Sequence, residues 1–202
     1  MPDPISWSLS LPYFSAALLF GYFCGSIPFG LIFTRMAGLG DVRSIGSGSI
    51  GATNVLRTGN KKLAALTVFA DFAKGLVPVL VGQQWGPDIA VLAALGAVLG
   101  HILPIWLKFK GGKGVATYIG VLVGLYWPAA LIFCATWLIV AGAMRISSLS
   151  ALVAIAATPV WLFYFEERQL VELFILLGII IYIAHHQNIA RLFKGNEAKI
   201  GQ

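Results

Sequence analysis

The chain alternates long apolar runs with short segments rich in glycine and basic residues. Runs of about 20 apolar residues are the length that a helix needs to cross the hydrocarbon core of a bilayer. Such runs cover residues 11–33, 63–81, 89–107, 151–165 with the preceding 147–150, and 170–184. This pattern predicts an all-α, polytopic integral membrane protein.

Two apolar runs are predicted to be interrupted. Gly25, Pro28 and Gly30 inside the first run indicate a broken or closely packed helix. Residues 115–144 would form a single helix of about 45 Å, well beyond the ~30 Å hydrocarbon core. Trp127 lies near the middle of this stretch and Pro128 follows it, as expected for an interfacial aromatic residue and a turn. We therefore predict two short spans here.

The distribution of charge favours seven spans. With the N-terminus outside, nearly all basic residues then fall on one side, which the positive-inside bias identifies as the cytoplasm. These residues are Arg35, Arg43, Arg57, Lys61, Lys62, Lys108, Lys110, Lys113, Arg145, Arg191, Lys194 and Lys199. The other side holds Asp3, Asp88, Glu166 and Glu167, with Arg168 its only basic residue. We predict about seven transmembrane helices, with the N-terminus outside and the C-terminus cytoplasmic.

Composition agrees with this interpretation. The chain is 58% hydrophobic and only 11% charged, and its mean hydropathy is +0.86, which is typical of membrane proteins. No long polar stretch separates the apolar runs, so residues 1–202 are predicted to form a single membrane-embedded domain. The net charge of +6 is spread over loops, which indicates membrane orientation and not nucleic-acid binding. Cys24 and Cys134 each lie in an apolar run and show no disulfide or zinc spacing.

The first predicted cytoplasmic loop has the composition of a phosphate site. Small residues allow backbone N–H groups to converge on an anion, while hydroxyl, amide and guanidinium groups add donors. The alternative is an ordinary flexible surface loop. The candidate binding residues are Gly46, Ser47, Gly48, Ser49, Thr53, Asn54 and Arg57.

Two nucleotide-binding motifs can be excluded for this loop. Residues 46–51 match G-x-G-x-x-G, with Asp71 further along the chain. However, the preceding run 11–33 is a membrane span and not a strand of a βαβ unit, and Asp71 lies inside another span. A Walker A loop is excluded because no Gly-Lys-Ser or Gly-Lys-Thr ends either glycine-rich loop.

The second predicted cytoplasmic loop combines lysines with a glycine turn and leads into the next helix. This places cations and free helix N–H groups at one point, where phosphate is the natural ligand. The alternative, that the lysines only set topology or contact anionic lipid, applies most to Lys108. The candidate binding residues are Lys110, Gly112, Lys113 and Thr117.

A third cluster follows the last span. His185 and Asn188 are three residues apart and therefore share a helix face, so both are expected to point at one substrate. His186 is interpreted as a solvated ring. The chain has three histidines, no thiolate pair and no carboxylate cluster near them, so neither a metal site nor a cofactor is predicted.

Four motifs resemble the bacterial acyl-phosphate:glycerol-3-phosphate acyltransferase family. They are Gly-Ser-Ile-Pro-Phe-Gly at 25–30, the loop 46–57, the segment 100–117 and the motif 185–188. The resemblance covers nearly the whole chain, and the order and spacing of the motifs are highly specific. It implies a membrane enzyme of phospholipid synthesis in the bacterial inner membrane, with its active site at the cytoplasmic face.

The resemblance also implies the reaction. An acyl group passes from acyl phosphate to the sn-1 hydroxyl of glycerol 3-phosphate, giving 1-acyl-glycerol 3-phosphate and phosphate. The implied partners are these substrates, membrane lipid and, transiently, the soluble enzyme that makes acyl phosphate. The family's functional positions correspond to Ser47, Asn54, Arg57, Lys113, His185 and Asn188.

The chain departs from the family pattern at two positions, with Ser49 in place of the usual Asn and His186 in place of the usual Arg. The second change puts in doubt a fixed cation at position 186. The His-x-x-x-x-Asp pair of acyltransferases that use acyl-CoA or acyl carrier protein is absent. This absence agrees with an acyl donor of a different kind, as the resemblance implies. A transporter of phosphorylated compounds is the main alternative, because Asp71 and Lys74 lie inside a span. They are three residues apart and can instead pair with each other.

Overall fold

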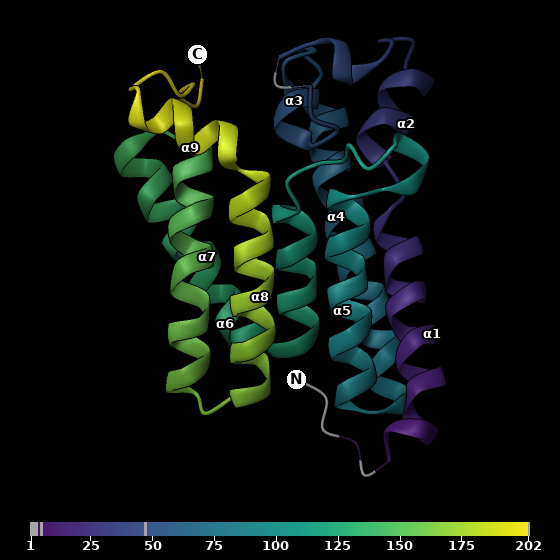
Figure 1. Ribbon diagram of the computed structural model, residues 1–202. Coiled ribbons are helices and arrows are strands. Elements are labelled where there is room, and N and C mark those ends of the chain that lie inside the picture. The colour runs from purple at the N-terminus through teal and green to yellow at the C-terminus, as the bar shows by residue number, and fades with distance from the viewer. Residues whose placement is uncertain (1–3, 5, 47, 202) are drawn as a thin grey trace. The chain divides into compact units, whose positions relative to one another are not determined.

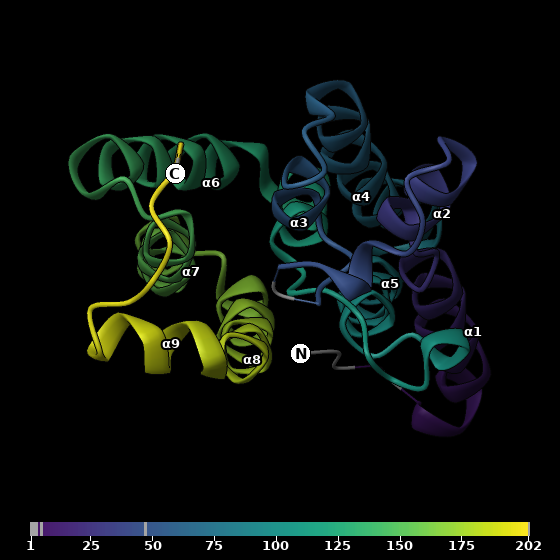
Figure 2. The same cartoon turned by 90° about the horizontal axis from the view of Figure 1, so that it is seen from above.

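The computed structural model describes residues 4, 6–46 and 48–201. Throughout these residues the chain forms helices and connecting loops and contains no strand, which confirms the all-α prediction. Contacts divide the chain into two compact units, one ending at Gly124 and the other beginning at Leu125. Figures 1 and 2 show the helices of each unit in two views. The single-domain interpretation stays a prediction.

The first unit is built around a close pair of helices, α1 and α5. Gly21 and Gly25 of α1 lie against the backbone of α5, and Gly96 and Gly100 of α5 lie against the backbone of α1, where any Cβ would collide with a carbonyl. Small residues are the usual means of close helix packing in membranes. The helices of this unit are α1 (Trp7–Gly25), α2 (Phe29–Met36), α3 (Ala52–Leu56), α4 (Lys61–Gly82), α5 (Pro87–Ile102) and the start of α6 (Val115–Met144).

Proline sets two of the helix ends. The predicted break in the first run is confirmed, because α1 ends at Gly25 and α2 begins at Phe29, after Pro28. The predicted run 89–107 lies within a candidate span, Pro87–Leu107, of which the α-helix α5 forms the first part. This helix ends at Ile102, because Leu103 takes an extended φ of −123° ahead of Pro104 and the residue before proline disfavours the helical region. A single 3₁₀ turn, Ile105–Leu107, follows.

The long helix α6 is interrupted as predicted. Tyr126 has φ −157° and ψ 85°, which are not helical values, and Pro128 follows two residues later. The break separates residues 115–125 from residues 127–144. The interruption is confirmed, while the crossing of the membrane by each piece stays a prediction.

The second unit contains the rest of α6 and a packed pair of helices, α7 (Ser147–Tyr164) and α8 (Arg168–Ala184). These two run side by side (Figure 1), and the Tyr182 hydroxyl of α8 donates to the Leu152 carbonyl of α7 at 2.9 Å. The short α9 (His186–Phe193) turns away from α8 by 66°. His185 lies at this bend, at the C-terminal end of α8 and immediately before α9.

The helices have the length and surface of membrane spans. In the described part of the chain, five helical segments are long and apolar enough to cross a bilayer, or six if the bent pair α8 and α9 counts as one span. Counting the two pieces of α6 separately gives the predicted seven. Large apolar side chains such as Phe69, Ile139 and Ile183 are mostly exposed, as expected where lipid and not water surrounds them. The number of spans and the orientation of the termini stay predictions.

Candidate functional site

The loop predicted to be the first on the cytoplasmic side, residues 41–57, is hereafter called the glycine loop. Several of its apolar side chains pack against neighbouring helices. Val42, Ile50 and Val55 are almost fully buried and form a small apolar cluster with Leu31 of α2 and Ala64 of α4. These apolar contacts hold the described residues of the loop at several points. That the loop binds phosphate stays a prediction.

Asn54 holds the glycine loop together from inside. Its side chain is buried, and its amide nitrogen lies 2.7, 3.1 and 2.8 Å from the carbonyl oxygens of Val42, Ile45 and Ser49. Ser49 also accepts a hydrogen bond from the Gly51 amide through its hydroxyl, at 3.2 Å. These contacts make Asn54 and Ser49 organisers of the loop backbone.

Arg57 lies against the glycines of the loop. Gly46 has φ +52°, and a Cβ at this position would collide with the Arg57 and Asn54 side chains. Glycine is therefore required here both for its backbone conformation and for space. Arg57 is exposed, at the end of α3, while Thr53 is exposed in the first turn of that helix. The predicted Ser47 lies outside the described residues.

An ion pair lies beside the glycines. Arg43 Nη2 is 2.6 Å from Asp41 Oδ2, and the Asp41 carboxylate also accepts from the Arg43 amide at 2.9 Å and from Arg35 at 3.0 Å. The hydrogen bond from Arg43 holds the pKa of the Asp41 carboxyl well below its usual range. The same contact raises the pKa of Arg43. Both groups are therefore charged at neutral pH.

The loop predicted to be the second on the cytoplasmic side, residues 103–114, is hereafter called the lysine loop. The Gly111 amide donates to the Ile102 carbonyl and the Gly112 amide donates to the His101 carbonyl, both at 3.1 Å. Lys108 and Phe109 adopt the left-handed conformation and are exposed. Gly114, with φ +84°, precedes Val115, the first residue of α6. The prediction that the loop leads directly into a helix is confirmed.

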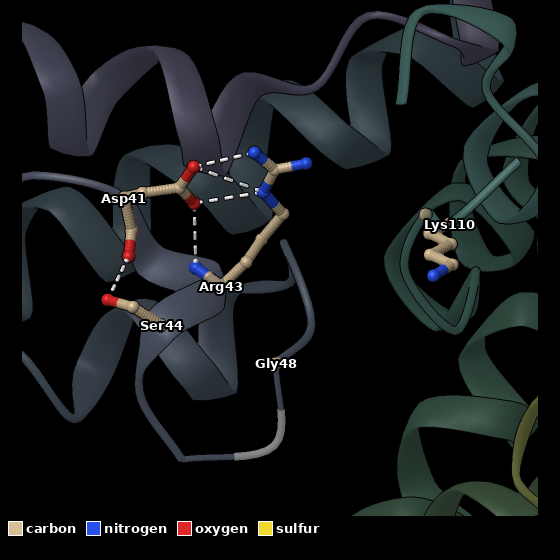
Figure 3. Close-up of a pocket in the computed structure, with 6 residues that line it drawn as sticks. Asp41, Arg43, Ser44, Gly48 and Lys110 are labelled. Carbon is tan, nitrogen blue, oxygen red and sulfur yellow. Dashed lines mark hydrogen bonds and ion pairs between the residues drawn. The ribbon is translucent and has the colours of Figure 1, made fainter. Parts of the chain in front are cut away.

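The two loops share one hollow of about 460 Å³. Figure 3 shows Lys110 across this hollow from Asp41 and Arg43. Of the residues predicted from the sequence, Gly48 and Lys110 line it. The full lining consists of Asp41, Arg43, Ser44, Gly48, Lys110 and Gly111.

The remaining predicted residues of the lysine loop lie beside α5 and α6. Lys113 is half-buried, two residues before α6. Gly112 is buried against the ring of His101, and a Cβ there would collide with its Nε2. Thr117 is fully buried, and its hydroxyl lies 3.1 Å from His101 Nδ1. Thr117 thus contacts His101, the residue against which Gly112 of the loop packs.

The second unit holds the predicted His185 and Asn188. His185 is buried, and its Nδ1 lies 2.8 Å from the Ile181 carbonyl. Since a carbonyl only accepts, Nδ1 carries the proton, and Nε2 is the acceptor of the neutral ring. His186 is exposed, and its Nδ1 contacts the Ile183 carbonyl.

The Asn188 amide nitrogen donates to Glu197, a residue that the sequence did not single out. Glu197 also accepts from Ser148 at 2.7 Å and from Arg191 at 2.6 Å. Burial raises the pKa of the Glu197 carboxyl, but the hydrogen bonds from Ser148, Asn188 and Arg191 together outweigh burial and lower it. Glu197 therefore fixes the Asn188 side chain from the C-terminal segment.

Sequence reasoning missed Asp41 and Arg43 at the hollow, and Ser148 and Glu197 beside Asn188. Asp41 and Arg43 are oppositely charged and lie two residues apart just before the glycines, which is a usable signal. Glu197 is an acidic residue within a basic segment. Its partner Ser148 is 49 residues away in the chain, so spacing cannot reveal the contact.

Comparison with known proteins identifies the family. The sequence model of the family described as glycerol-3-phosphate acyltransferase matches residues 15–195. A glycerol-3-phosphate acyltransferase of Brucella anthropi is 56% identical over 201 residues, which cover 100% of this chain and 98% of that protein. One of Mesorhizobium japonicum is 58% identical over 185 residues, covering 92% of this chain and 95% of that protein.

Two solved structures are also similar. One is the crystal structure of PlsY (YgiH), an integral membrane glycerol 3-phosphate acyltransferase, in its glycerol 3-phosphate form, with 35% identity and a TM-score of 0.89 over 93% of this chain and 96% of that one. The other is its lysophosphatidic acid form, with 34% identity and a TM-score of 0.87 over 93% and 95% of the chains. The match along the whole sequence and the likeness in structure show that this chain belongs to the glycerol-3-phosphate acyltransferase family.

Proposed function

We propose that the protein transfers a fatty acyl group from acyl phosphate to the sn-1 hydroxyl of glycerol 3-phosphate. The products are 1-acyl-glycerol 3-phosphate and phosphate. The observation that carries the proposal is the hollow between two folded, glycine-rich cationic loops in a membrane protein of this family. The PlsY structures in glycerol 3-phosphate and lysophosphatidic acid forms support the acceptor and the product. The site belongs, in this proposal, to the cytoplasmic face of the bacterial inner membrane.

The loops bring cations to a reaction between two anions. Glycerol 3-phosphate and acyl phosphate both carry a phosphate, so they repel each other when they meet. Arg57 and Lys113 offset this repulsion, with Lys110 at the hollow, and the glycine backbones supply N–H donors. Holding the acceptor hydroxyl near the carbonyl of the donor also raises the rate, because the two reacting groups are already in position.

The chemistry needs no enzyme nucleophile, because an acyl phosphate is already a mixed anhydride. The sn-1 oxygen attacks the acyl carbon, forming the ester C–O bond while the C–O bond to phosphate breaks. Phosphate leaves with the electron pair and takes the hydroxyl proton, so atoms and charge balance. In this proposal His185 Nε2 accepts a hydrogen bond from substrate and orients it, supported by the Nδ1 contact to Ile181.

An apolar groove in the second unit suits the acyl chain. It lies between α7 and α8, has a volume of about 390 Å³ and contains no charged side chain. Ile155 and Pro159 of α7 and Gly178 and Ile179 of α8 are among its lining residues. Apolar walls of this kind accept a hydrocarbon chain without cost in lost hydrogen bonds.

Donor choice tests the proposal. Purified protein in detergent or nanodiscs should release phosphate from palmitoyl phosphate only when glycerol 3-phosphate is present, with 1-acyl-glycerol 3-phosphate identified by mass spectrometry. Palmitoyl-CoA should give no comparable turnover, because the chain lacks the His-x-x-x-x-Asp pair. Equal turnover with palmitoyl-CoA would contradict the donor assignment, and glycerol 3-phosphate passing into sealed vesicles without acylation would favour a transporter.

A further inference from the structure

The first unit contains a buried polar cluster that the proposed chemistry does not use. Lys74 Nζ lies 2.8 Å from Asp71 Oδ1, and the side chains of both residues are at most 3% exposed. Asp71 Oδ1 lies 3.8 Å from His101 Nδ1, and the same ring nitrogen is 3.1 Å from the Thr117 hydroxyl. The cluster therefore joins α4, α5 and the first turn of α6.

At one end the cluster supports the break between α1 and α2. Lys74 Nζ donates to the Ile27 carbonyl at 2.8 Å and lies 5.8 Å from the centre of the Phe29 ring. Since Pro28 has no N–H, the break removes a helical donor, and side chains must satisfy the carbonyls around it. Trp106 of the lysine loop donates to the neighbouring Ser26 carbonyl at 2.8 Å. Hydrogen bonds thus connect the α1–α2 break to α4, through Lys74, and to the lysine loop, through Trp106.

At the other end the cluster holds the lysine loop. The His101 ring fills the space where a Cβ of Gly112 would lie, and the His101 carbonyl accepts from the Gly112 amide at 3.1 Å. Thr117, which contacts the same ring, is four residues after Lys113. His101 therefore contacts the chain on both sides of Lys113.

Stability alone does not explain a buried ion pair. Removing two charges from water is costly, and replacing such a pair with apolar residues of similar volume is often neutral or stabilising. In a membrane span an ionisable pair is a functional candidate by default. A role in fixing geometry accounts for the pair, because each of its members has a further contact to a segment that leads into a phosphate-binding loop.

We propose that Asp71, Lys74 and His101 are positioning residues, which fix the lysine loop and the α1–α2 break so that the phosphate of glycerol 3-phosphate is held in the correct place. Lys74 secures the break that precedes α2 and the glycine loop. His101, whose Nδ1 contacts the Thr117 hydroxyl and lies 3.8 Å from Asp71, secures Gly112 and the start of α6. This inference rests on the proposed function for the identity of the phosphorylated ligand.

The test separates positioning from folding. Asp71→Asn/Lys74→Met removes both charges without leaving either one unpaired, and Thr117→Val removes the hydroxyl contact of His101. Lys62→Met, which changes an exposed lysine of the same helix, is the matched control. Each protein is measured for thermal unfolding and for glycerol 3-phosphate binding by calorimetry, without any acyl donor.

We expect the double variant to unfold within a few degrees of the wild type but to bind glycerol 3-phosphate about tenfold or more weakly. Thr117→Val should show a smaller loss, and Lys62→Met none. Unchanged affinity in a folded double variant would overturn the inference, as would a lowered melting temperature with unchanged affinity. If the wild type binds glycerol 3-phosphate but does not turn over acyl phosphate, the donor assignment fails, and the binding data still decide the positioning role.

Discussion

Arg57 and Lys113 differ from the other cations of the two loops in their surroundings. Arg57 lies against Gly46, in a glycine loop held by Asn54. Lys113 is half-buried between Gly112, which contacts His101, and the start of α6. Lys108 lies in the left-handed turn of the lysine loop and, like Arg57, is exposed. A cation on a packed backbone segment loses little conformational entropy when it binds phosphate. More of its electrostatic attraction therefore remains as net binding free energy.

Replacing Arg57 or Lys113 with Ala should therefore lower turnover strongly. Loss of one cation from a partly desolvated phosphate site costs about 2–4 kcal/mol in the transition state, which corresponds to a decrease of roughly 30-fold to 1000-fold. The measurement is steady-state phosphate release with acyl phosphate and glycerol 3-phosphate. Lys108→Ala is the matched control and should stay within about threefold of wild type. Similar losses in all three variants would contradict the assignment.

The ring of His185 allows a separate test. With Nδ1 donating to Ile181, the neutral ring presents Nε2 as an acceptor. If phosphate takes the proton and His185 only accepts a hydrogen bond, His185→Gln and His185→Asn should retain a substantial share of activity, because an amide oxygen can also accept. His185→Ala should be much less active.

The pH–rate profile distinguishes this role from general-base catalysis. A wild-type limb that disappears in a folded but almost inactive His185→Gln protein would show that the imidazole is the base. Retention of both the limb and the activity would agree with proton transfer to phosphate.

At the scale of the elements, the C-terminal segment stabilises the second unit through one carboxylate. Glu197 accepts from Ser148 at the start of α7 and from Arg191 of α9, and its side chain is 8% exposed. Three residues further on, the Ile200 carbonyl accepts from the Arg145 guanidinium at 3.1 Å. The segment after α9 is thus fastened to the turn before α7, and Asn188 is held by the same carboxylate.

This arrangement predicts a dependence of stability on pH. Because folding lowers the pKa of Glu197, its contribution is present above the unfolded value of ~4.3 and is lost as pH falls through the lower folded value. At pH 7, Glu197→Gln should lower the melting temperature by about 2–8 °C. The difference from wild type should shrink below about pH 4. Glu166→Gln, at an exposed position, is the control, and a difference that persists at low pH would contradict the role of the charge.

At the scale of the whole molecule, the number of spans sets the side on which each loop lies. The interruption of α6 at Tyr126 is compatible with two short spans, and Trp127 beside it is 63% exposed. If the chain crosses twice, position 127 reaches the outer interface. If it crosses once, position 127 lies within the hydrocarbon core and every later loop changes side.

Single-cysteine labelling decides between these topologies. In a background lacking Cys24 and Cys134, Ser44→Cys and Lys110→Cys should be labelled only from the cytoplasmic side. Trp127→Cys and Glu167→Cys should be labelled only from outside. Gly112 is a poor position for this purpose because a Cβ there would collide with His101. Cytoplasmic labelling of position 167 would contradict the seven-span topology.

Several features of this protein were determined by the sequence alone. The apolar runs predicted the spanning helices, since their length and hydropathy suit only lipid. Pro28 marked the first break, and Trp127 with Pro128 marked the break in α6, because proline acts on its immediate neighbours. The two glycine-rich loops and the family were also recognisable, since these motifs are continuous in the chain.

The tertiary structure decided what each polar residue of these motifs contacts. Asn54 and Thr117 were both predicted to bind substrate, which stays a prediction. The structure adds that Asn54 holds three loop carbonyls and that Thr117 contacts His101. Glu197 accepts a hydrogen bond from Ser148, 49 residues away in the chain. Lys74 donates one to the Ile27 carbonyl, 47 residues away. Local patterns express the conformational preference of neighbouring residues, whereas these contacts arise only when packed helices bring distant groups together in a medium where each polar group needs a partner.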